Sequence, residues 1–135
     1  MKVAIVYAST TGNTEALANA AAEAAKNAGR EVTVKTADQA DIGETQSADL
    51  ILLGSPAMGD EVLEDSMEEF YANLKSSLSG KKVGLFGSYD WGDGQWMRDW
   101  EENAKSSGAI VIGTVIANLA PDEAALDSVK KLASA

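Results

Sequence analysis

Apolar and polar positions follow one another along this chain in blocks that predict five strands separated by helices. Short apolar runs predict strands at residues 2–7, 50–54, 82–87 and 109–116, and an alternating run predicts a half-exposed edge strand at 31–36. The run LILLG at 50–54 is apolar throughout, which is typical of a central strand buried on both faces.

Helical periodicity fills the segments between these strands. A helix is predicted at 13–28, ending at Gly29, with a buried face of Leu17, Ala20, Ala21, Ala24 and Ala28. A short helical turn is expected near Ile42. A second long helix is predicted from residue 61 or 63 to 78, with Leu63, Met67, Phe70, Tyr71 and Leu74 at helical spacing. Two more helices are predicted at 95–107 and 122–133.

This regular alternation predicts an α/β fold, in which helices cover both faces of a parallel sheet and the crossovers are right-handed. We expect residues 1–135 to form a single domain. Ligands of such sheets bind at the carboxyl ends of the strands. Three loops of unusual composition follow strands at that edge, at residues 9–14, 55–60 and 88–94, and the functional site is predicted there.

The composition excludes several classes of chemistry. The chain contains no cysteine and no histidine, so it has no disulfide, no thiolate metal site and no catalytic Ser-His-Asp or Cys-His group. No apolar stretch approaches the roughly 18 residues of a membrane span, and the first apolar run is too short for a signal peptide. A cytoplasmic location is therefore expected.

The net charge of −10 is concentrated in one segment. Ten acidic residues and no basic residue lie between Lys35 and Lys75. Such a surface disfavours nucleic acid and anionic membranes. It attracts basic partner proteins, or it is simply a solvated face. Part of it is predicted on the exposed side of the second long helix, as the i,i+4 pairs of Glu64, Asp65, Glu68 and Glu69.

The loop at 9–14, Ser-Thr-Thr-Gly-Asn-Thr, joins a buried strand to a helix. A helix N-terminus offers unpaired N–H groups and a partial positive charge, which suit a phosphate. No Lys or Arg lies between Lys2 and Lys26, so an anion here would be held by dipoles alone. The alternative is a threonine-rich cap on an ordinary surface helix.

The other two loops carry side chains suited to a flat ring. Trp91 lies in a loop between Asp90 and Gly92 with nothing obvious to pack against nearby, and a planar ligand is its simplest partner. Met58 either contacts the other face of that ring or closes the core. Trp96 and Trp100, four residues apart on a predicted helix, are expected in the core. A phosphate and a large ring describe a mononucleotide with adenine or flavin, and in a redox protein the cofactor would supply the chemistry.

Three segments carry a family resemblance, VYASTTGNTE (6–15), LLGSPAMGDEVLEDS (52–66) and GKKVGLFGSYDWGDGQWMRDW (80–100). Together they resemble the short-chain flavodoxins of clostridia and other anaerobes along nearly the whole chain. The resemblance implies a three-layer fold with strand order 2-1-3-4-5 and FMN at the switch point. It also implies a monomeric low-potential carrier of single electrons, cycling between semiquinone and hydroquinone, that serves oxidoreductases with basic docking surfaces and is not itself an enzyme.

The resemblance also implies roles for individual residues. The phosphate would be held by residues 9–14, the flavin N3 region by Glu61, and the outer ring face by Trp91. The peptide at Gly59 would turn over on one-electron reduction. The full predicted FMN-binding set is Ser9, Thr10, Thr11, Gly12, Asn13, Thr14, Ser55, Pro56, Ala57, Met58, Gly59, Asp60, Glu61, Ser88, Tyr89, Asp90, Trp91 and Gly92.

The chain departs from the family at two positions. It has Ala8 where many relatives have tryptophan, and Asp90 where relatives often have glycine. Each carboxylate about 10 Å from the flavin would disfavour reduction by about 0.4 kcal/mol at water-like dielectric. Six of them would lower the potential by roughly 100 mV at most, namely Asp60, Glu61, Glu64, Asp65, Asp90 and Asp93.

Three other functions were weighed against this interpretation. A phospho-receiver domain is rejected, because it requires acidic residues where this chain has Tyr7-Ala8 and Leu53-Gly54. A flavoenzyme would need substrate-binding insertions, for which 135 residues leave little room. An activator dedicated to a single enzyme remains the alternative to a general carrier.

Overall fold

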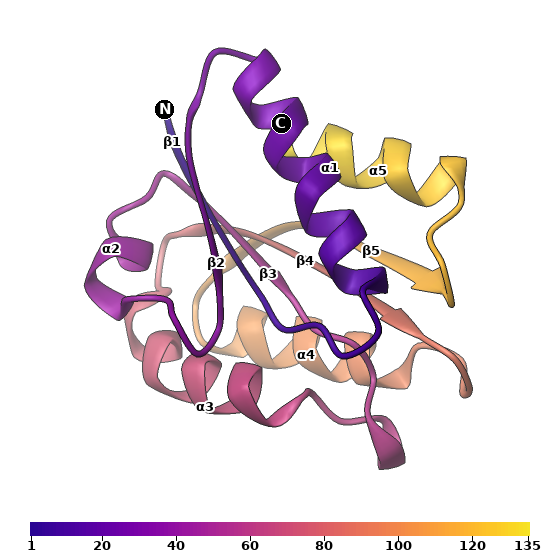
Figure 1. The fold of residues 1–135 in the computed structure, drawn as a ribbon. Coiled ribbons are helices and arrows are strands. Elements are labelled where there is room, and N and C mark those ends of the chain that lie inside the picture. Colours follow the sequence, from indigo (N-terminus) through magenta and orange to yellow (C-terminus); the bar gives the residue numbers. More distant parts are fainter.

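The computed structural model of the protein describes residues 1–135 except for the side chain of Asp60. Five parallel strands form one sheet in the order β2-β1-β3-β4-β5 (Figure 1). The strands are β1 (Lys2–Tyr7), β2 (Glu31–Thr36), β3 (Leu50–Gly54), β4 (Lys82–Tyr89) and β5 (Ile110–Asn118). The predicted fold class is confirmed, with β3 fully buried at the centre and β2 half-exposed at one edge.

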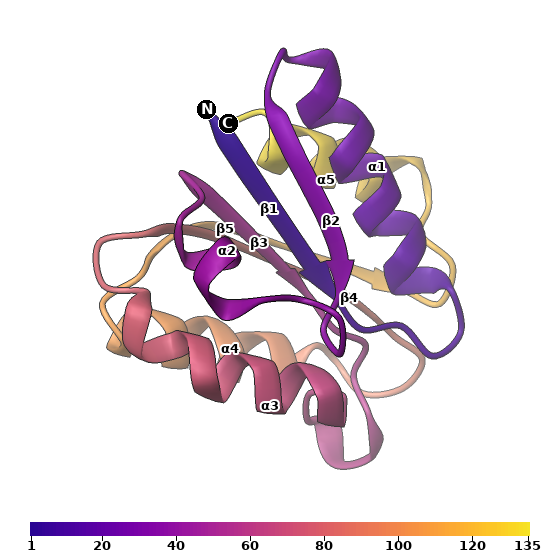
Figure 2. The ribbon, with the colours of Figure 1, turned by 60° about the vertical axis from the view of Figure 1, so that its left-hand side comes forward.

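Helices cover both faces of this sheet, as predicted. Helices α1 and α5 lie on one face and α3 and α4 on the other (Figure 2), and each face has its own apolar cluster. The helices are α1 (Asn13–Asn27), α2 (Ile42–Gln46), α3 (Asp65–Leu74), α4 (Gln95–Ser106) and α5 (Glu123–Ala133), with 3₁₀ turns η1 (Gly59–Glu61) and η2 (Lys75–Ser77).

The buried face of α1 differs from the predicted one. Leu17 and Ala21 are buried as expected, but Ala28 is exposed and Ala20 and Ala24 are only partly covered. The buried residues are Thr14, Leu17, Ala18, Ala21, Ala22 and Ala25. Alanines occur all around this helix, so the pattern does not mark the edges of one face. Packing against the sheet and α5 selects the face instead.

Helix α3 begins later than predicted. It starts at Asp65, because Glu64 is its N-cap and accepts hydrogen bonds from the amides of Ser66 (2.9 Å) and Met67 (3.3 Å). An antiparallel bridge between Ala57 and Leu63 keeps Leu63 in an extended segment before the helix. Glu64 is therefore half-buried and caps the helix, and does not belong to its exposed face.

Strand β4 is two residues longer than the sequence pattern indicates. Ser88 and Tyr89, predicted in a loop, pair with Ala117 and Asn118 of β5. The prediction stopped at Gly87 because the apolar run stops there. The β-ladder continues because a neighbouring strand supplies the hydrogen bonds, and this extension carries Ser88 into the site region.

Candidate functional site

The carboxyl ends of β1, β3 and β4 bring three loops together, loop 1 (9–14), loop 2 (55–60) and loop 3 (90–94). They surround a cavity of about 130 Å³. Its lining consists of Thr10, Thr11, Asn13, Pro56, Ala57, Ser88, Tyr89, Asp90 and Leu119. Eight of these nine residues belong to the predicted set, and Leu119 is the exception.

Loop 1 presents backbone N–H groups at the start of α1. Gly12 has φ of 90°, in the left-handed region that glycine reaches without a steric clash. Ser9 Oγ accepts hydrogen bonds from the amides of Gly12 (3.1 Å) and Glu15 (3.3 Å). Within the described part of the chain no acceptor meets the amides of Thr10, Thr11, Asn13 and Thr14. These amides and the dipole of α1 form an anion-binding arrangement.

Behind loop 1, a tyrosine holds the acidic residue of the first helical turn. The hydroxyl of Tyr7 donates a hydrogen bond to Glu15 (2.9 Å). Burial, and then this hydrogen bond, raise the pKa of Tyr7 above its ordinary value. The phenol therefore remains a donor at neutral pH, and the Glu15 carboxylate is engaged at the helix N-terminus.

Ser88, at the end of β4, connects loops 1 and 2. Its hydroxyl lies 2.9 Å from the hydroxyl of Thr14, and its carbonyl accepts a hydrogen bond from Ala57 N–H (2.8 Å). Ser88 and Thr14 are 3% and 1% exposed, so this contact is shielded from water. The Thr14 hydroxyl, predicted to face a phosphate, bonds to Ser88 in this structure, and its amide is the group left available.

Ser55 fixes the course of loop 2 and does not line the cavity. Its buried hydroxyl donates to Pro56 O (3.0 Å) and accepts from Glu64 N–H (3.0 Å). Its carbonyl accepts from the indole of Trp96 (3.3 Å) and lies so close to β4 that a Cβ on Gly87 would come within 2.0 Å of it. Only glycine permits this approach, which sets loop 2 against β4.

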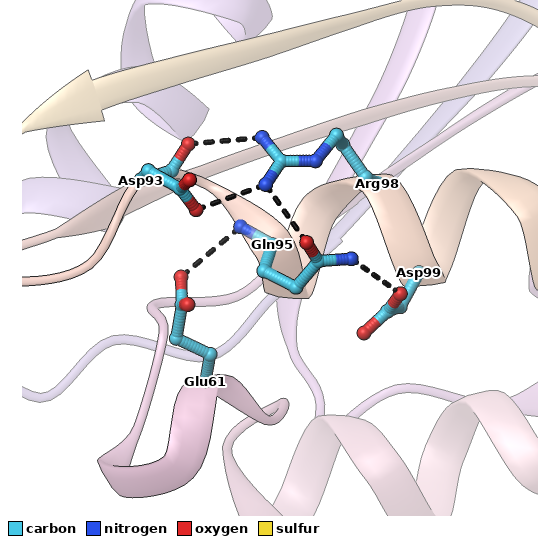
Figure 3. A network of polar contacts seen from close by, with 5 residues as sticks. All are labelled: Glu61, Asp93, Gln95, Arg98 and Asp99. Atoms are coloured by element: carbon cyan, nitrogen blue, oxygen red, sulfur yellow. Dashed lines mark hydrogen bonds and ion pairs between the residues drawn. The ribbon is translucent and has the colours of Figure 1, made fainter.

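Glu61 links loop 2 to loop 3 and α4 (Figure 3). Its carboxylate accepts a hydrogen bond from the amide of Gln95 (3.0 Å), the first residue of α4. The N-cap of that helix, Gly94, supplies no side chain, so Glu61 caps the helix from another loop. A Cβ on Gly92 would lie 2.6 Å from this carboxylate. Gly92 also has φ of 88°, in the left-handed region that favours glycine, so glycine at that position lets the two loops approach.

Arg98 attaches loop 3 to α4. Its guanidinium donates to the Asp93 carboxylate (2.9 Å), the Asp93 carbonyl (3.0 Å) and the side-chain oxygen of Gln95 (2.8 Å) (Figure 3). Both side chains of this ion pair are exposed, so Arg98 offsets the Asp93 charge only in part. Asp93 is one of the six carboxylates predicted to lower the potential, and its pairing with Arg98 reduces its share of that effect.

The predicted ring contacts lie outside the cavity lining. Trp91 lies in loop 3 and is 58% exposed, which agrees with the expectation that it has no obvious packing partner within the chain. Met58 is half-buried and belongs to neither core cluster. The side chain of Asp60 lies outside the described residues. Trp96 and Trp100 are buried, which confirms the prediction that they belong to the core.

Gly59 has open space around it. A Cβ there would meet no atom within 4 Å, and its φ lies outside the left-handed region. The present backbone conformation therefore does not require glycine at this position.

Leu119 is the cavity residue that the sequence did not reveal. It follows β5, outside the three loops, and nothing in the neighbouring residues Asn118 and Ala120 indicates a site. Its positive φ of 59° has no signature in the residue type. Only the pairing of β4 with β5 brings it beside Asp90.

The described part of the chain contains no cluster of three or more acidic residues arranged to hold a metal ion. None of its helices has both the length and the apolar character needed to cross a bilayer.

Comparison with known proteins gives the family. The flavodoxin family model matches residues 5–131. The chain is 52% identical over 123 residues to a flavodoxin of Megasphaera elsdenii, with 90% of each chain covered. This chain belongs to the flavodoxin family. It is also 45% identical over 135 residues to a flavodoxin of Clostridium beijerinckii, covering 96% of this chain and 98% of that one.

A solved flavodoxin has the same architecture. The solution structure of two-electron reduced Megasphaera elsdenii flavodoxin matches with a TM-score of 0.90 and 48% identity, over 98% of both chains. Flavodoxins bind FMN and carry electrons at low potential, and they are electron-transfer proteins, not enzymes. The residues of this chain fit that cofactor. The loop 1 amides have no acceptor among the described residues and can bind a phosphate, and they lie beside a cavity at the switch point of the sheet.

The contact between Ser88 and Thr14 leads to a testable prediction. Ser88→Ala leaves the buried Thr14 hydroxyl without a partner, which costs about 1–3 kcal/mol in unfolding free energy. The double variant Ser88→Ala/Thr14→Val removes both polar groups and should cost less than Ser88→Ala alone. Urea unfolding of the two variants measures this difference. Equal or additive losses would contradict the pairing.

Proposed function

We propose that FMN binds at this cavity with its phosphate in loop 1. The observation that carries the proposal is the set of loop 1 amides that have no acceptor among the described residues. They lie at the positive end of α1, in a loop without a basic residue. A phosphate there would be held by N–H groups and hydroxyls, which agrees with membership of the flavodoxin family.

The flavin ring is proposed to extend outward from the cavity. About 130 Å³ is less than the roughly 300 Å³ at which pockets begin to enclose a drug-sized ligand. The ring would thus reach the rim, where Met58 and the exposed Trp91 offer apolar surface. Bound FMN supplies the one-electron chemistry. The chain orients it and leaves one edge open to partners.

The predicted binding set is retained with its roles refined. Residues 9–14 hold the phosphate. Ser9 also bonds to the amides of Gly12 and Glu15 at the start of α1, and Thr14 joins loop 1 to Ser88. Ser55 and Gly92 shape the loops, and Glu61 spaces them. We propose that the remaining members of the set contact the cofactor directly, and these are Pro56, Ala57, Met58, Gly59, Asp60, Ser88, Tyr89, Asp90 and Trp91.

Flavodoxin membership implies redox proteins as partners. We propose that these partners dock through basic surfaces, because exposed carboxylates of Asp65, Glu68 and Asp90 lie near the loops. Electron exchange should slow as salt rises, and stopped-flow rates at several ionic strengths measure this. A general carrier would exchange electrons with many donors and a dedicated activator with few. A single-domain monomer, no binding to nucleic acid or membranes, and a cytoplasmic location remain predictions.

Asn13 provides the direct test of the phosphate site. Asn13→Asp adds a negative charge at the first residue of α1, which stabilises the helix by about 0.3–1 kcal/mol. The same charge opposes a phosphate, since unit charges about 4 Å apart interact by about 4 kcal/mol at intermediate dielectric. We expect FMN binding to weaken by at least about tenfold while the FMN-free chain keeps its stability. Flavin absorbance titration and urea unfolding measure the two effects.

The control is Asn27→Asp, the same change at the opposite end of α1. There the added charge opposes the helix dipole, so stability should fall slightly and FMN affinity should not change. If Asn13→Asp binds FMN as tightly as the unmodified chain, the phosphate does not lie in loop 1.

Asp90 lines the cavity and is exposed, so its charge should bear on the flavin. Asp90→Asn should raise the midpoint potential of the second one-electron reduction by roughly 15–20 mV, from about 0.4 kcal/mol at about 10 Å. Glu31→Gln removes an exposed charge at the first residue of β2, at the end of the sheet opposite the cavity, and should leave the potential unchanged. Spectroelectrochemical titration measures the potential of both variants. An equal shift in both would contradict the prediction that the Asp90 charge acts through its proximity to the flavin.

At Gly59 the proposal is that the peptide changes conformation when FMN takes up an electron. A Cβ added at Gly59 meets no atom within 4 Å in the present conformation, so Gly59→Ala should not lower the unfolding free energy. Gly59→Val carries the same Cβ and adds β-branching. Both resist the left-handed region, valine more strongly. The difference between the potentials of the first and second one-electron reductions of FMN should therefore be largest in the unmodified chain, smaller in Gly59→Ala and smallest in Gly59→Val. An unchanged difference would exclude the rearrangement.

A further inference from the structure

We propose that Leu119 forms a wall of the FMN site and that its strained backbone is maintained for this contact. Leu119 has φ of 59°, and in the described part of the chain only Glu61 shares a positive φ among non-glycine residues. Both residues flank the loops at the carboxyl end of the sheet. A bulky side chain in this region costs free energy and persists where the surroundings enforce it, often at functional sites.

The surroundings of Leu119 do enforce this conformation. Its amide donates a short hydrogen bond of 2.7 Å to the carbonyl of Tyr89, and the side-chain amide of Asn118 donates to the same carbonyl at 3.2 Å. Tyr89 and Asn118 are the last pair in the β4–β5 register. The end of the sheet therefore holds Leu119 in place.

Packing within the protein does not account for the leucine. The residue is 53% exposed and belongs to neither core cluster, yet it lines the cavity together with Thr10, Thr11 and Asp90. An apolar side chain held half in water beside a polar cavity gains stability only when something covers it. Since FMN at this cavity is itself the proposed function, the inference rests on that proposal. The covering group is an apolar part of the cofactor, not its phosphate.

Two variants separate contact with the cofactor from a structural role. Leu119→Asn replaces the isobutyl group by a residue that tolerates positive φ, and Leu119→Gly removes the side chain altogether. We expect the dissociation constant of FMN to rise by about five- to tenfold in both. For Leu119→Asn the urea midpoint of the full chain without FMN should stay the same or rise, because strain is relieved. The midpoint at saturating FMN should rise less than it does for the unmodified chain.

The matched control is Ile110→Asn. Ile110 is the first residue of β5, at the opposite end of that strand from Leu119. It is 51% exposed, close to the value for Leu119. Its replacement should leave FMN affinity unchanged. Unchanged FMN affinity in both Leu119 variants would overturn the inference. A loss of FMN-free stability that accounts for the whole loss of binding in Leu119→Asn would also overturn it.

The Asn13→Asp variant shows whether a negative result concerns Leu119 alone or the proposed FMN site as a whole. If Asn13→Asp binds FMN normally, the proposed site is wrong and the Leu119 inference falls with it. If Asn13→Asp weakens binding while the Leu119 variants bind normally, only the Leu119 inference is wrong.

Discussion

The site depends on one buried contact at the end of β4. Ser88 bonds through its hydroxyl to Thr14 and through its carbonyl to Ala57, so a single residue ties loops 1 and 2 to the same strand. Strand β4 continues past its apolar run to place Ser88 there, and Gly87 beside it leaves room for the Ser55 carbonyl of loop 2. Buried polar groups that satisfy one another in this way fix a geometry more strictly than apolar packing does.

Electrostatics separates the two ends of the cofactor site. Loop 1 presents N–H groups and hydroxyls without a nearby basic residue in the sequence, so an anion there is held by dipoles. At the other side, acidic residues surround loops 2 and 3, and Arg98 offsets only Asp93. A cation in the phosphate loop would reduce the negative field near the ring. Its absence is consistent with a carrier that works at low potential.

Backbone strain occurs at both sides of this site. Glu61 and Leu119 hold positive φ without being glycine, and each is fixed by hydrogen bonds to a different element, α4 for Glu61 and β4 for Leu119. These two residues connect the outer loops to the rigid sheet and helix. The loops can therefore be short and glycine-rich and still keep their spacing.

The sequence by itself determined the elements of the fold and the place of the site. Two apolar runs and one alternating run matched β1, β3 and β2 to the residue, and the three unusual loops indicated the correct end of the sheet. Eight of the nine cavity residues followed from those loops and the family motifs. This succeeded because a strand or helix reports its own periodicity within a few residues.

Tertiary structure alone decided how the pieces meet. Thr14 and Ser88 are 74 positions apart, and Glu61 and Gln95 are 34 positions apart, so no local sequence pattern predicts either hydrogen bond. The same reason explains the late start of α3, the longer β4 and the place of Leu119. In each case a hydrogen bond from a distant or neighbouring segment overrode what the local sequence favoured. Residue type determines which groups can pair, and the fold determines which of them do.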